Sequence, residues 1–533
     1  MRRTFVVLTV IGGLLASTCP LQAEHRFASV QAAPPQPAFG TTLIEPCDIQ
    51  GLLKGQEGLL IVPENRRDAD SRAIAVHYFH FPKRQASSLP PVFVLPGGPG
   101  DFVSADDLRA GGRRPDVYST FSEIVAFNRL RDVVIVNQRG HSQSPGLSKL
   151  PAVWTAKAAG DFRKPTSIAE TSGRFAKGLQ ATLDGCKVQG IDLRGYDILN
   201  LTYDIHDLRK AYGYEKIALR GSSFGSQWAL AYMKRWPDYV DRAILAGVEP
   251  LDHTYDSAEG VWNVYRRIEQ QVREAKLAGL PDEGLLRTIE SIVKRLEGQP
   301  VTVRGRHPRR DLSANVTIGV EDFRHYLARP ILDSAPHSRR SLELWPKFVL
   351  EIYDGDYQYL ASKIMDDRPE PLVQGLLYSL IDNSLGISTE RERRLGSEPA
   401  RRWLGDINWQ YKATRDATPS PAIDDSFRKS DRSDIPVLMI HGDLDLATPI
   451  ENAEELLESF PNGHLIRIHG GTHAATHHAA SAVPEFPQWL TGFMNSENPV
   501  SQLADLPESI KLPPLPFEDS STPSLSRQLL REE

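Results

Sequence analysis

The stretch RGSSFGSQW (residues 220–228) places three serines within five positions, and a serine hydroxyl becomes a nucleophile when a base activates it. A nucleophile elbow, the sharp strand-to-helix turn that exposes such a serine, requires the pattern Gly-x-Ser-x-Gly. Only the register GSSFG, residues 221–225, fits that pattern. The apolar run IAL lies just before GSSFG, and the helical pattern SQWALAYMKRW follows it directly. The sequence therefore predicts Ser223 as the nucleophile; the alternative is a plain glycine-rich turn.

A catalytic serine needs a histidine base, and the histidine needs a carboxylate that fixes its tautomer. With this kind of elbow, the acid and then the base follow at the ends of late strands. The strand pattern PVLMI (436–440) is followed by HGDLDLATP, which offers Asp443 and Asp445. The pattern HLIRI (464–468) is followed by HGGTH, which ends at His473. We expect His473 to be the base, whereas spacing alone leaves both aspartates open.

Other histidines in this region fit the role of base less well. His464 begins a strand at the wrong end, and His469 directly abuts the strand end, where it can satisfy backbone groups. His477 and His478 are expected to enter the last helix. His473 alone follows a flexible Gly-Gly pair in a loop beyond the strand.

An oxyanion hole is the fourth part that acyl transfer requires, and it needs backbone N–H groups aimed at the developing negative charge. The residue after the nucleophile, Phe224, can supply one. The other is expected from the loop LPGGPG, residues 95–100, because glycines let a backbone amide approach a ligand closely. The alternative reading of this loop is an ordinary turn between strand and helix.

The elements around these motifs predict an α/β fold. Strand-like runs lie at 59–62, 73–81, 92–95, 133–136, 217–219 and 243–248. The run at 73–81 alternates as a half-exposed strand does, and the later runs are apolar throughout, as central parallel strands are. Between them, apolar residues recur at helical spacing from Ile198 to Tyr212, and Gly213 follows as a C-terminal stop. This order predicts a mostly parallel sheet with helices on both faces.

A helical insertion interrupts this pattern before its last two strands, and it is expected to cover the site as a cap. The predicted organisation is a signal peptide at 1–23, a leader at 24–40, the first part of the core at 41–251, the helical cap at 252–430, the last part of the core at 431–497 and a Pro/Ser-rich tail at 498–533. The tail is expected to be extended or disordered.

Composition narrows the function and the location. The 533 residues carry a formal net charge of -6, which argues against a nucleic-acid partner. The N-terminus has a basic start, a short apolar run and a small-residue site near Ala23, so we expect an exported protein, periplasmic or secreted, without stable membrane insertion after cleavage. An uncleaved anchor is the alternative.

After cleavage near Ala23, Cys47 and Cys186 remain, either as one disulfide or as two buried thiols.

Together these motifs resemble the proline iminopeptidase and tripeptidyl aminopeptidase families of α/β-hydrolases. The resemblance rests on LPGGPG, NQRGHSQS, the run from YDILNLTYDIHDLRKAYGYEKIALRGSSFG to ILAGVEP, and HGDLDLATP. It covers about residues 45–250 and 430–495 and none of the insertion or tail. Two departures bear on specificity: Pro96 stands where iminopeptidases often have histidine, and Asn137 stands where aspartate usually precedes Gln-Arg-Gly.

The resemblance makes Ser223 the nucleophile and His473 the base. It selects Asp445 over Asp443 as the acid, since Asp445 lies two residues before Ala-Thr-Pro. It also makes Gly98 the second oxyanion donor beside Phe224. No metal and no organic cofactor are implied.

The implied function is that of an exported serine exopeptidase acting near a free N-terminus. An ammonium group in a partly dry pocket calls for a carboxylate, and Glu249 and Asp382 are candidates, although both can also be solvated or structural. A carboxylester hydrolase acting on small esters could use the same residues, because a triad does not choose its acyl substrate. A non-catalytic binding protein is the third possibility. An epoxide hydrolase or dehalogenase would need a carboxylate where Ser223 stands.

Overall fold

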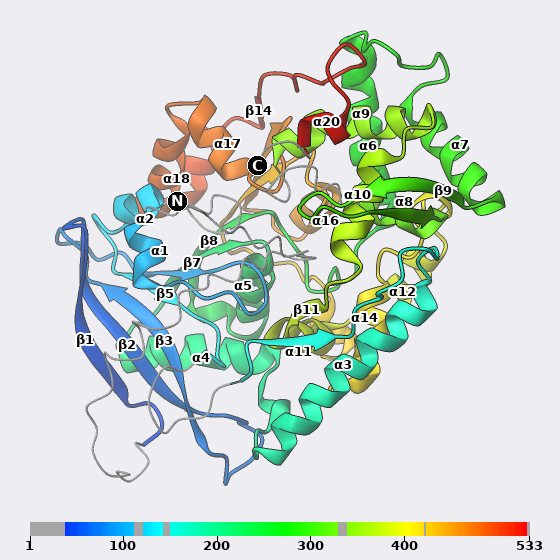
Figure 1. Cartoon of the computed structure of the whole chain (residues 1–533). Coiled ribbons are helices and arrows are strands. Elements are labelled where there is room, and N and C mark those ends of the chain that lie inside the picture. Colours follow the sequence, from blue (N-terminus) through cyan, green and yellow to red (C-terminus); the bar gives the residue numbers. More distant parts are fainter. Residues whose placement is uncertain (1–37, 111–120, 142–149, 329–337, 420–422, 530–533) are drawn as a thin grey trace.

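A ten-stranded sheet forms the centre of the molecule (Figure 1). The computed structural model describes residues 38–110, 121–141, 150–328, 338–419 and 423–529. The predicted signal peptide and all but the end of the leader lie outside these ranges. The strands, in sheet order, are β1 (Thr42–Ile49), β2 (Leu53–Pro63), β3 (Ala73–Phe81), β5 (Val133–Val136), β4 (Val92–Leu95), β7 (Ile217–Ser222), β8 (Val240–Ala246), β12 (Val437–Gly442), β13 (Gly463–His469) and β14 (Ser509–Lys511).

The sheet is antiparallel at one end and parallel from β5 onward. The four residues of β4, VFVL, and of β5, VVIV, are all buried, as expected for central strands covered on both faces. This confirms the predicted α/β sheet. The prediction that β3 is half-exposed is wrong, since all nine of its residues are buried.

Polar residues within β3 are buried because they have partners. His77 Nε2 lies 2.9 Å from Glu57 Oε1, and His80 Nε2 lies 3.0 Å from the Tyr214 hydroxyl. The alternation of polar and apolar residues in the sequence therefore reflects buried hydrogen bonds, not exposure to water.

Helices cover both faces of the sheet. One face carries α4 (Ile198–Ala211), α5 (Phe224–Arg235) and α16 (Glu451–Leu457), and the other carries α1 (Ala105–Arg109), α2 (Phe121–Phe127), α17 (Ala475–Ala482), α18 (Phe486–Asn495) and α19 (Pro499–Ala504). The side chain of Asp197 caps the start of α4 by accepting the N–H of Asn200 at 2.7 Å. Gly213, with φ +68°, follows its end as predicted.

The two cysteines lie in different hydrophobic clusters and are not joined by a disulfide. Cys47 is on β1 and belongs to the cluster with α2 and α18, whereas Cys186 belongs to the cluster with α4 and α5. The sheet separates these clusters, so the disulfide considered from the sequence does not form. Burial raises the pKa of the Cys186 thiol.

Much of the cap has a hydrophobic core of its own, whereas its helix at residues 376–385 packs into the cluster on one face of the sheet. It contains α6 (Ala258–Glu274), α7 (Leu285–Gly298), α8 (Val320–Ala328), α9 (Arg339–Tyr353), α10 (Gln358–Asp367), α11 (Leu376–Leu385), α12 (Thr389–Gly396), α13 (Arg401–Leu404), α14 (Trp409–Thr414), α15 (Asp425–Arg428) and the hairpin of β9 (Val301–Arg306) and β10 (Ser313–Ile318). Apolar residues that recur at helical spacing within residues 261–272 and 285–296 are buried on α6 and α7.

Residues assigned to the core by sequence also contribute to the cap. The strand β6 (Val153–Ala156) pairs with β11 (Leu372–Gly375), and α3 (Ile168–Val188) packs against α14. The indole of Trp154 donates to Ser379 Oγ at 3.0 Å, which fastens β6 to α11. The cap is therefore built from two separate stretches of chain.

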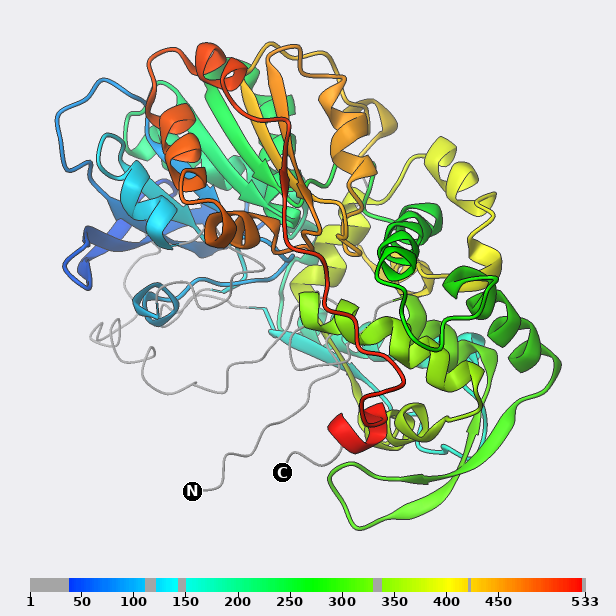
Figure 2. The ribbon, with the colours of Figure 1, turned by 90° about the horizontal axis from the view of Figure 1, so that it is seen from above.

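The C-terminal segment ties the core to the cap, in contrast to the expectation of a loose tail. It adds β14 to the edge of the sheet beside β13 and then crosses to the cap, where it ends in α20 (Leu525–Leu529), as Figure 2 shows in red. Leu512 is buried against the sheet, whereas Leu515 and Leu525 are buried in the core of the cap. Lys347 Nζ on α9 donates to the carbonyl of Asp519 at 2.9 Å.

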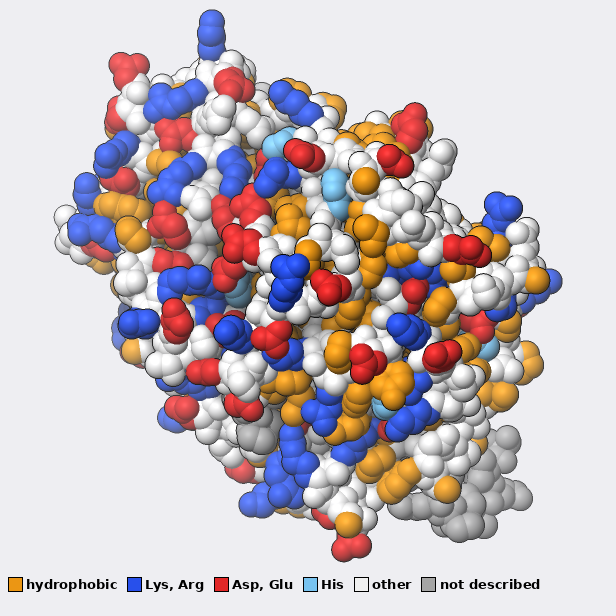
Figure 3. All heavy atoms as spheres, turned by 180° about the vertical axis from the view of Figure 1, so that it is seen from behind, with side chains coloured by type: hydrophobic (Ala, Val, Ile, Leu, Met, Phe, Trp, Pro, Cys, Tyr) orange, Lys and Arg blue, Asp and Glu red, His pale blue; other side chains and the backbone are white. Residues whose placement is uncertain are grey.

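The surface seen from behind carries basic and acidic side chains interspersed with one another (Figure 3). Within the described residues, no helix has both the length and the apolar character needed to cross a membrane.

Candidate active site

Ser223 occupies the turn between β7 and α5 with φ 54° and ψ -131°. A non-glycine residue with positive φ is strained, at a cost on the order of 1–3 kcal/mol, and persists only where its surroundings enforce it. The Ser223 N–H donates to the Ala246 carbonyl at 2.9 Å, and the Ser223 carbonyl accepts the backbone N–H of Ser226 at 2.7 Å. The turn is thus held from both sides.

The three serines of the motif have separate environments. Ser222 Oγ accepts a hydrogen bond from Arg220 Nη1 at 2.7 Å, and Ser226 is fully buried with its hydroxyl donating to the Ser223 carbonyl at 2.6 Å. Ser223 is the one that stands at the turn itself.

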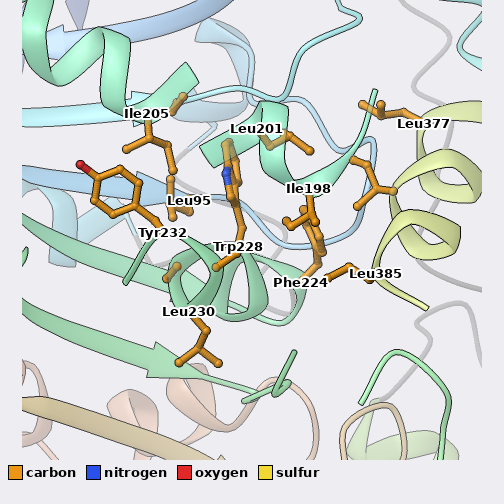
Figure 4. Close-up of a cluster of buried hydrophobic side chains, with 14 of the residues drawn as sticks. Leu95, Ile198, Leu201, Ile205, Phe224, Trp228, Leu230, Tyr232, Leu377 and Leu385 are labelled. Carbon is orange, nitrogen blue, oxygen red and sulfur yellow. The ribbon is translucent and has the colours of Figure 1, made fainter. Parts of the chain in front are cut away.

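The glycines that flank Ser223 are required by close packing. A Cβ on Gly225 would lie 2.2 Å from the Leu95 carbonyl oxygen, and one on Gly221 would lie 2.3 Å from the Gly225 carbonyl oxygen. The side chains of Phe224 and Trp228 pack beneath the turn in the cluster of Figure 4, which joins β4, α4, α5 and α11. The first turn of α5 therefore rests directly on the chain that leaves β4.

Asp445 and His473 are brought together by the loops that follow β12 and β13. His473 Nδ1 lies 2.7 Å from Asp445 Oδ2. Asp445 is fully buried and also accepts the N–H of Ala447 at 2.9 Å and both the N–H and the hydroxyl of Thr448, at 3.0 and 2.8 Å. Burial alone would raise the pKa of Asp445, but the charge of His473 and hydrogen bonds from His441 and His473 hold it well below its usual range. An ionised Asp445 accepts the Nδ1 proton of His473, so the basic nitrogen of a neutral His473 is Nε2.

The end of β8, the strand next to β7, connects His473 to Ser223. A Cβ on Gly247 would lie 3.0 Å from His473 Cε1, so the imidazole packs against the residue that follows β8. The preceding residue, Ala246, accepts the N–H of Ser223. Ser223, Asp445 and His473 thus gather at the carboxyl ends of four adjacent parallel strands.

A second aspartate and histidine pair forms in the same two loops. Asp443 Oδ2 lies 2.9 Å from His469 Nδ1, and Asp443 Oδ1 accepts the N–H of Gly470 at 2.8 Å. The side chain of His469 is 44% exposed, whereas that of His473 is 8% exposed. The alternatives that spacing left open are therefore both paired, each with its own histidine, and only Asp445 pairs with His473.

The remaining histidine candidates have other surroundings. His464 Nε2 donates to the Pro507 carbonyl at 3.0 Å, next to β14. Burial lowers the pKa of His478 on α17 to about 4, aided by the charge of Arg339.

The loop after β4 lies beside the elbow. Gly98 has φ +64°, and a Cβ there would lie 2.8 Å from Asp101 Oδ2, so this position requires glycine. A Cβ on Gly100 would lie 3.5 Å from Leu377 Cβ, so the cap helix α11 covers the loop. The structure thus places the expected donors Gly98 and Phe224 on two segments in van der Waals contact.

The segment after β5 was not singled out for a role at the site from the sequence, yet it holds the same loop. The side chain of Gln138 donates to the Gly98 carbonyl and accepts the N–H of Gly100. The side chain of Asn137 accepts the N–H of Val103 and donates to the Val103 carbonyl. The side chain of Asn137 is fully buried and also donates to His77 Nδ1 at 2.8 Å. The departure from the family pattern at Asn137 therefore lies in a buried scaffold. Two polar residues at the end of an apolar strand were the available signal.

His441 was also missed. It is fully buried, its Nδ1 accepts the N–H of Val248 at 3.1 Å, and its Nε2 therefore carries the proton that it donates to the Thr448 carbonyl. This histidine links the end of β8 to the loop of Asp445.

Acidic side chains converge next to His473. Burial raises the pKa of Glu249 well above its usual range, and the charges of Asp382 and Asp256 add to this rise. The pKa of Asp382, which is 5% exposed on α11, is likewise raised by burial and by Asp256, although a hydrogen bond from Tyr378 opposes the rise. The N–H of Glu249 donates to Ser226 Oγ at 2.9 Å, which places the backbone of Glu249 close to the elbow.

A cavity of about 210 Å³ lies between the chain that leaves β8 and the cap. Its walls include Tyr255, Asp256, Leu395, Arg401, Asp406 and Lys412. Tyr255 stacks on Tyr411 with ring centres 5.0 Å apart, and the Tyr411 hydroxyl lies 2.9 Å from that of Tyr378. Aromatic rings thus connect this cavity to α11. Within the ranges that the structure describes, no three His, Cys, Asp or Glu side chains are grouped to hold a metal ion.

Two family models match the chain. The alpha/beta hydrolase fold matches residues 90–281, which contain the elbow, and the family described as TAP-like protein matches residues 407–491, which contain Asp445 and His473. No curated protein matches the sequence.

Solved structures with related folds are distant. A bromoperoxidase from Bacillus anthracis is 15% identical, with 82% of this chain and 100% of that chain covered and a TM-score of 0.33. A meta-cleavage product hydrolase from Pseudomonas fluorescens is 14% identical, with 79% and 96% covered and a TM-score of 0.31. A serine hydrolase from Cycloclasticus zankles is 10% identical, with 85% and 98% covered and a TM-score of 0.30.

The family matches and the strand order indicate the fold of this chain, because the similarities to the solved structures are too low to do so. The sheet, the strained serine turn and both matched segments agree: the chain has the α/β-hydrolase fold, and its C-terminal core resembles TAP-like proteins.

Proposed function

We propose that this protein is a serine exopeptidase that hydrolyses peptide bonds near a free N-terminus. The observation that carries the proposal is a set of three carboxylates beside the His473–Asp445 pair: Asp382, which is buried, and Glu249 and Asp256, which are partly buried. Buried carboxylates that raise one another's pKa attract a cation, because a positive charge removes their mutual repulsion. The ammonium group of a peptide N-terminus supplies such a charge.

In the proposed reaction, Ser223 Oγ attacks the scissile carbonyl carbon while His473 Nε2 takes the hydroxyl proton. Asp445 holds His473 in the required tautomer and stabilises the imidazolium. The N–H groups of Gly98 and Phe224 bind the oxyanion of the tetrahedral intermediate. His473 then gives its proton to the leaving amine, and the C–N bond breaks to leave an ester on Ser223.

Hydrolysis of that ester repeats the same steps with water. His473 takes a proton from the water, whose oxygen attacks the ester carbonyl, and then returns a proton to Ser223 Oγ as the acid product leaves. The three carboxylates place the N-terminus so that the scissile bond lies over Ser223, and the cap limits the length of chain that can precede this bond.

The test compares aminoacyl-arylamides that have a free or an N-acetylated α-amine. We expect the free substrates to be cleaved in a Ser223-dependent way and the blocked ones to be cleaved at least about 100-fold more slowly, because the carboxylates then lose their ionic partner. Equal cleavage of both would contradict the exopeptidase proposal. Good turnover of short esters without peptide cleavage would favour a carboxylester hydrolase instead.

The variants Glu249→Gln and Asp382→Asn sharpen this test. Each is expected to raise KM for free-amine substrates and to leave a short neutral ester unaffected. A digest of a peptide library, read by mass spectrometry, then shows how many residues are released at a time.

The proposal includes export, which the N-terminal pattern of the sequence supports. N-terminal sequencing of protein recovered from outside the cytoplasm should find a start close to residue 24. An intact N-terminus on cell-associated protein would contradict it.

A further inference from the structure

Gln138 stands immediately behind the loop that supplies the proposed oxyanion donor Gly98. It lies two residues after β5, which pairs in parallel with β4, so the segments that leave the two strands run side by side. Gln138 is 1% exposed. A buried amide must satisfy both of its ends, which restricts it to partners that hold matching positions.

The side-chain amide of Gln138 bridges the loop at two points. Its Nε2 donates to the Gly98 carbonyl at 2.9 Å, and its Oε1 accepts the N–H of Gly100 at 2.7 Å. The Gly98 carbonyl also accepts the N–H of Asp101 at 3.0 Å. With a donor on one side and an acceptor on the other, Gln138 can bind this loop in one orientation only.

This bridge fixes residues that would otherwise rotate freely. Gly98 and Gly100 have φ +64° and +91°, and glycine loses more conformational freedom on ordering than any other residue. The Gly98 N–H belongs to the peptide unit just before the carbonyl that is held, so the bridge restricts the directions that this N–H can take through φ and ψ of Gly98. An oxyanion hole requires donors that are oriented before the charge develops.

We propose that Gln138 is a positioning residue that sets the Gly98 N–H toward the oxyanion formed on the substrate of Ser223. The inference rests on the proposed function, since it assumes acyl transfer to Ser223. Gln138 does not touch the substrate; it acts through the loop. Asn137 holds the far end of the same segment at Val103, so the region after β5 acts as a two-amide scaffold for the loop.

The experiment compares an ester with its thionoester, in which sulfur replaces the carbonyl oxygen. Sulfur accepts hydrogen bonds weakly, so an intact oxyanion hole favours the oxygen substrate. The variants are Gln138→Met, which removes both hydrogen bonds, and Gln138→Glu, which keeps the acceptor for Gly100 and sets a carboxylate against the Gly98 carbonyl. Gln227→Met is the matched control, because Gln227 is also a fully buried amide but donates its hydrogen bonds to Pro250 and Thr254.

We expect Gln138→Met to lower kcat for the ester about 100-fold with KM within about threefold, comparable to the loss of one oxyanion donor. The ratio of kcat/KM for ester over thionoester should fall at least about tenfold in both Gln138 variants. It should stay at the wild-type value in Gln227→Met, whatever that change does to Tm. A preserved ratio in either folded Gln138 variant overturns the inference. Absence of Ser223-dependent turnover of both substrates by the wild type overturns the proposed function and this inference with it.

Discussion

Two aspartate–histidine pairs stand in the same two loops, Asp445–His473 and Asp443–His469. They share residue types, chain order and nearly the same separation between nitrogen and oxygen, 2.7 and 2.9 Å. They differ in location. The buried pair, Asp445–His473, packs against Gly247 beside the elbow. The other pair, Asp443–His469, has a half-exposed histidine, and we call it the rim pair. Residue type and pairing therefore do not separate the pair proposed to be catalytic from the other pair; burial and the position beside the turn of Ser223 do.

The rim pair joins the two loops that carry the buried pair. Asp443 binds the N–H of Gly470, and the next residue, Leu444, donates its N–H to the Gly471 carbonyl at 2.8 Å. On the cap, Arg267 Nη1 donates to the Asp443 carbonyl at 3.1 Å. We infer that the rim pair holds the two loops together, whereas the buried pair transfers protons to and from Ser223.

The largest expected difference is between the two histidines. His473→Ala should lower kcat by about 10⁴-fold or more, because the nucleophile loses its base. His469→Ala should change kcat by less than about threefold, as expected for an ion pair whose histidine is half-exposed. Both are measured with a free aminoacyl-arylamide, with Tm as the check on folding. Comparable losses of kcat in the two variants would remove the distinction.

The two aspartates give the next comparison. Asp445→Asn should lower kcat about 10³- to 10⁴-fold, since an amide can hold His473 in the wrong tautomer. Asp443→Asn should leave kcat within about threefold and lower Tm by a few degrees, because the hydrogen bond to Gly470 is weakened. Steady-state kinetics and thermal unfolding on the same samples decide this. If Asp443→Asn lost more kcat than Asp445→Asn, the acid that orients the base would be Asp443.

Thr448 offers a smaller effect that belongs to the buried pair alone. Thr448→Val removes the hydroxyl that donates to Asp445 at 2.8 Å, and the backbone N–H donors of Ala447 and Thr448 remain. We expect kcat to fall about 10-fold, the value of one hydrogen bond to a charged group. Thr448→Ser should restore most of it; a serine variant as slow as the valine one would show that packing, not the hydroxyl, is responsible.

The smallest expected effect concerns stability in acid. The pKa of Asp445 lies well below its usual range, because hydrogen bonds and charge from His473 and His441 outweigh burial. A carboxyl with a depressed pKa in the folded state adds stability above its unfolded pKa of about 4, and this stability is lost as pH falls toward the folded value. The free energy of unfolding, measured with urea between about pH 5 and 2, should therefore fall more steeply with decreasing pH in the wild type than in Asp445→Asn. Identical slopes would contradict an ionised, stabilised Asp445.

The sequence predicted the core well because its signals are local. The strands at 73–81, 92–95 and 133–136 have the predicted bounds, and for the last two a continuous apolar run in a covered sheet leaves little choice. The elbow was readable because Gly221 and Gly225 are fixed by packing against backbone atoms, which no other residue allows. Both loops that carry the acid and the base follow strands that were predicted from the same kind of run.

Features that depend on distant contacts were not readable. The C-terminal tail looks disordered from composition, yet Leu515 and Leu525 find a hydrophobic core that exists only once the cap has folded. The exposure expected for β3 was wrong because His77 and His80 have buried partners on other elements. Gln138 and His441 could not be assigned, because their roles depend on which strands become neighbours.

The insertion of the cap has a consequence in time. Strands β8 and β12 are neighbours in the sheet, yet most of the cap lies between them in the chain, so their pairing closes a very long loop, which slows folding. About 250 residues separate Ser223 from His473. At a synthesis rate of about 5–20 residues per second, the ribosome needs roughly 12–50 s to pass from one to the other. A nascent chain therefore contains Ser223 for many seconds before it contains His473, and the site can assemble only once synthesis has passed into the last fifth of the chain.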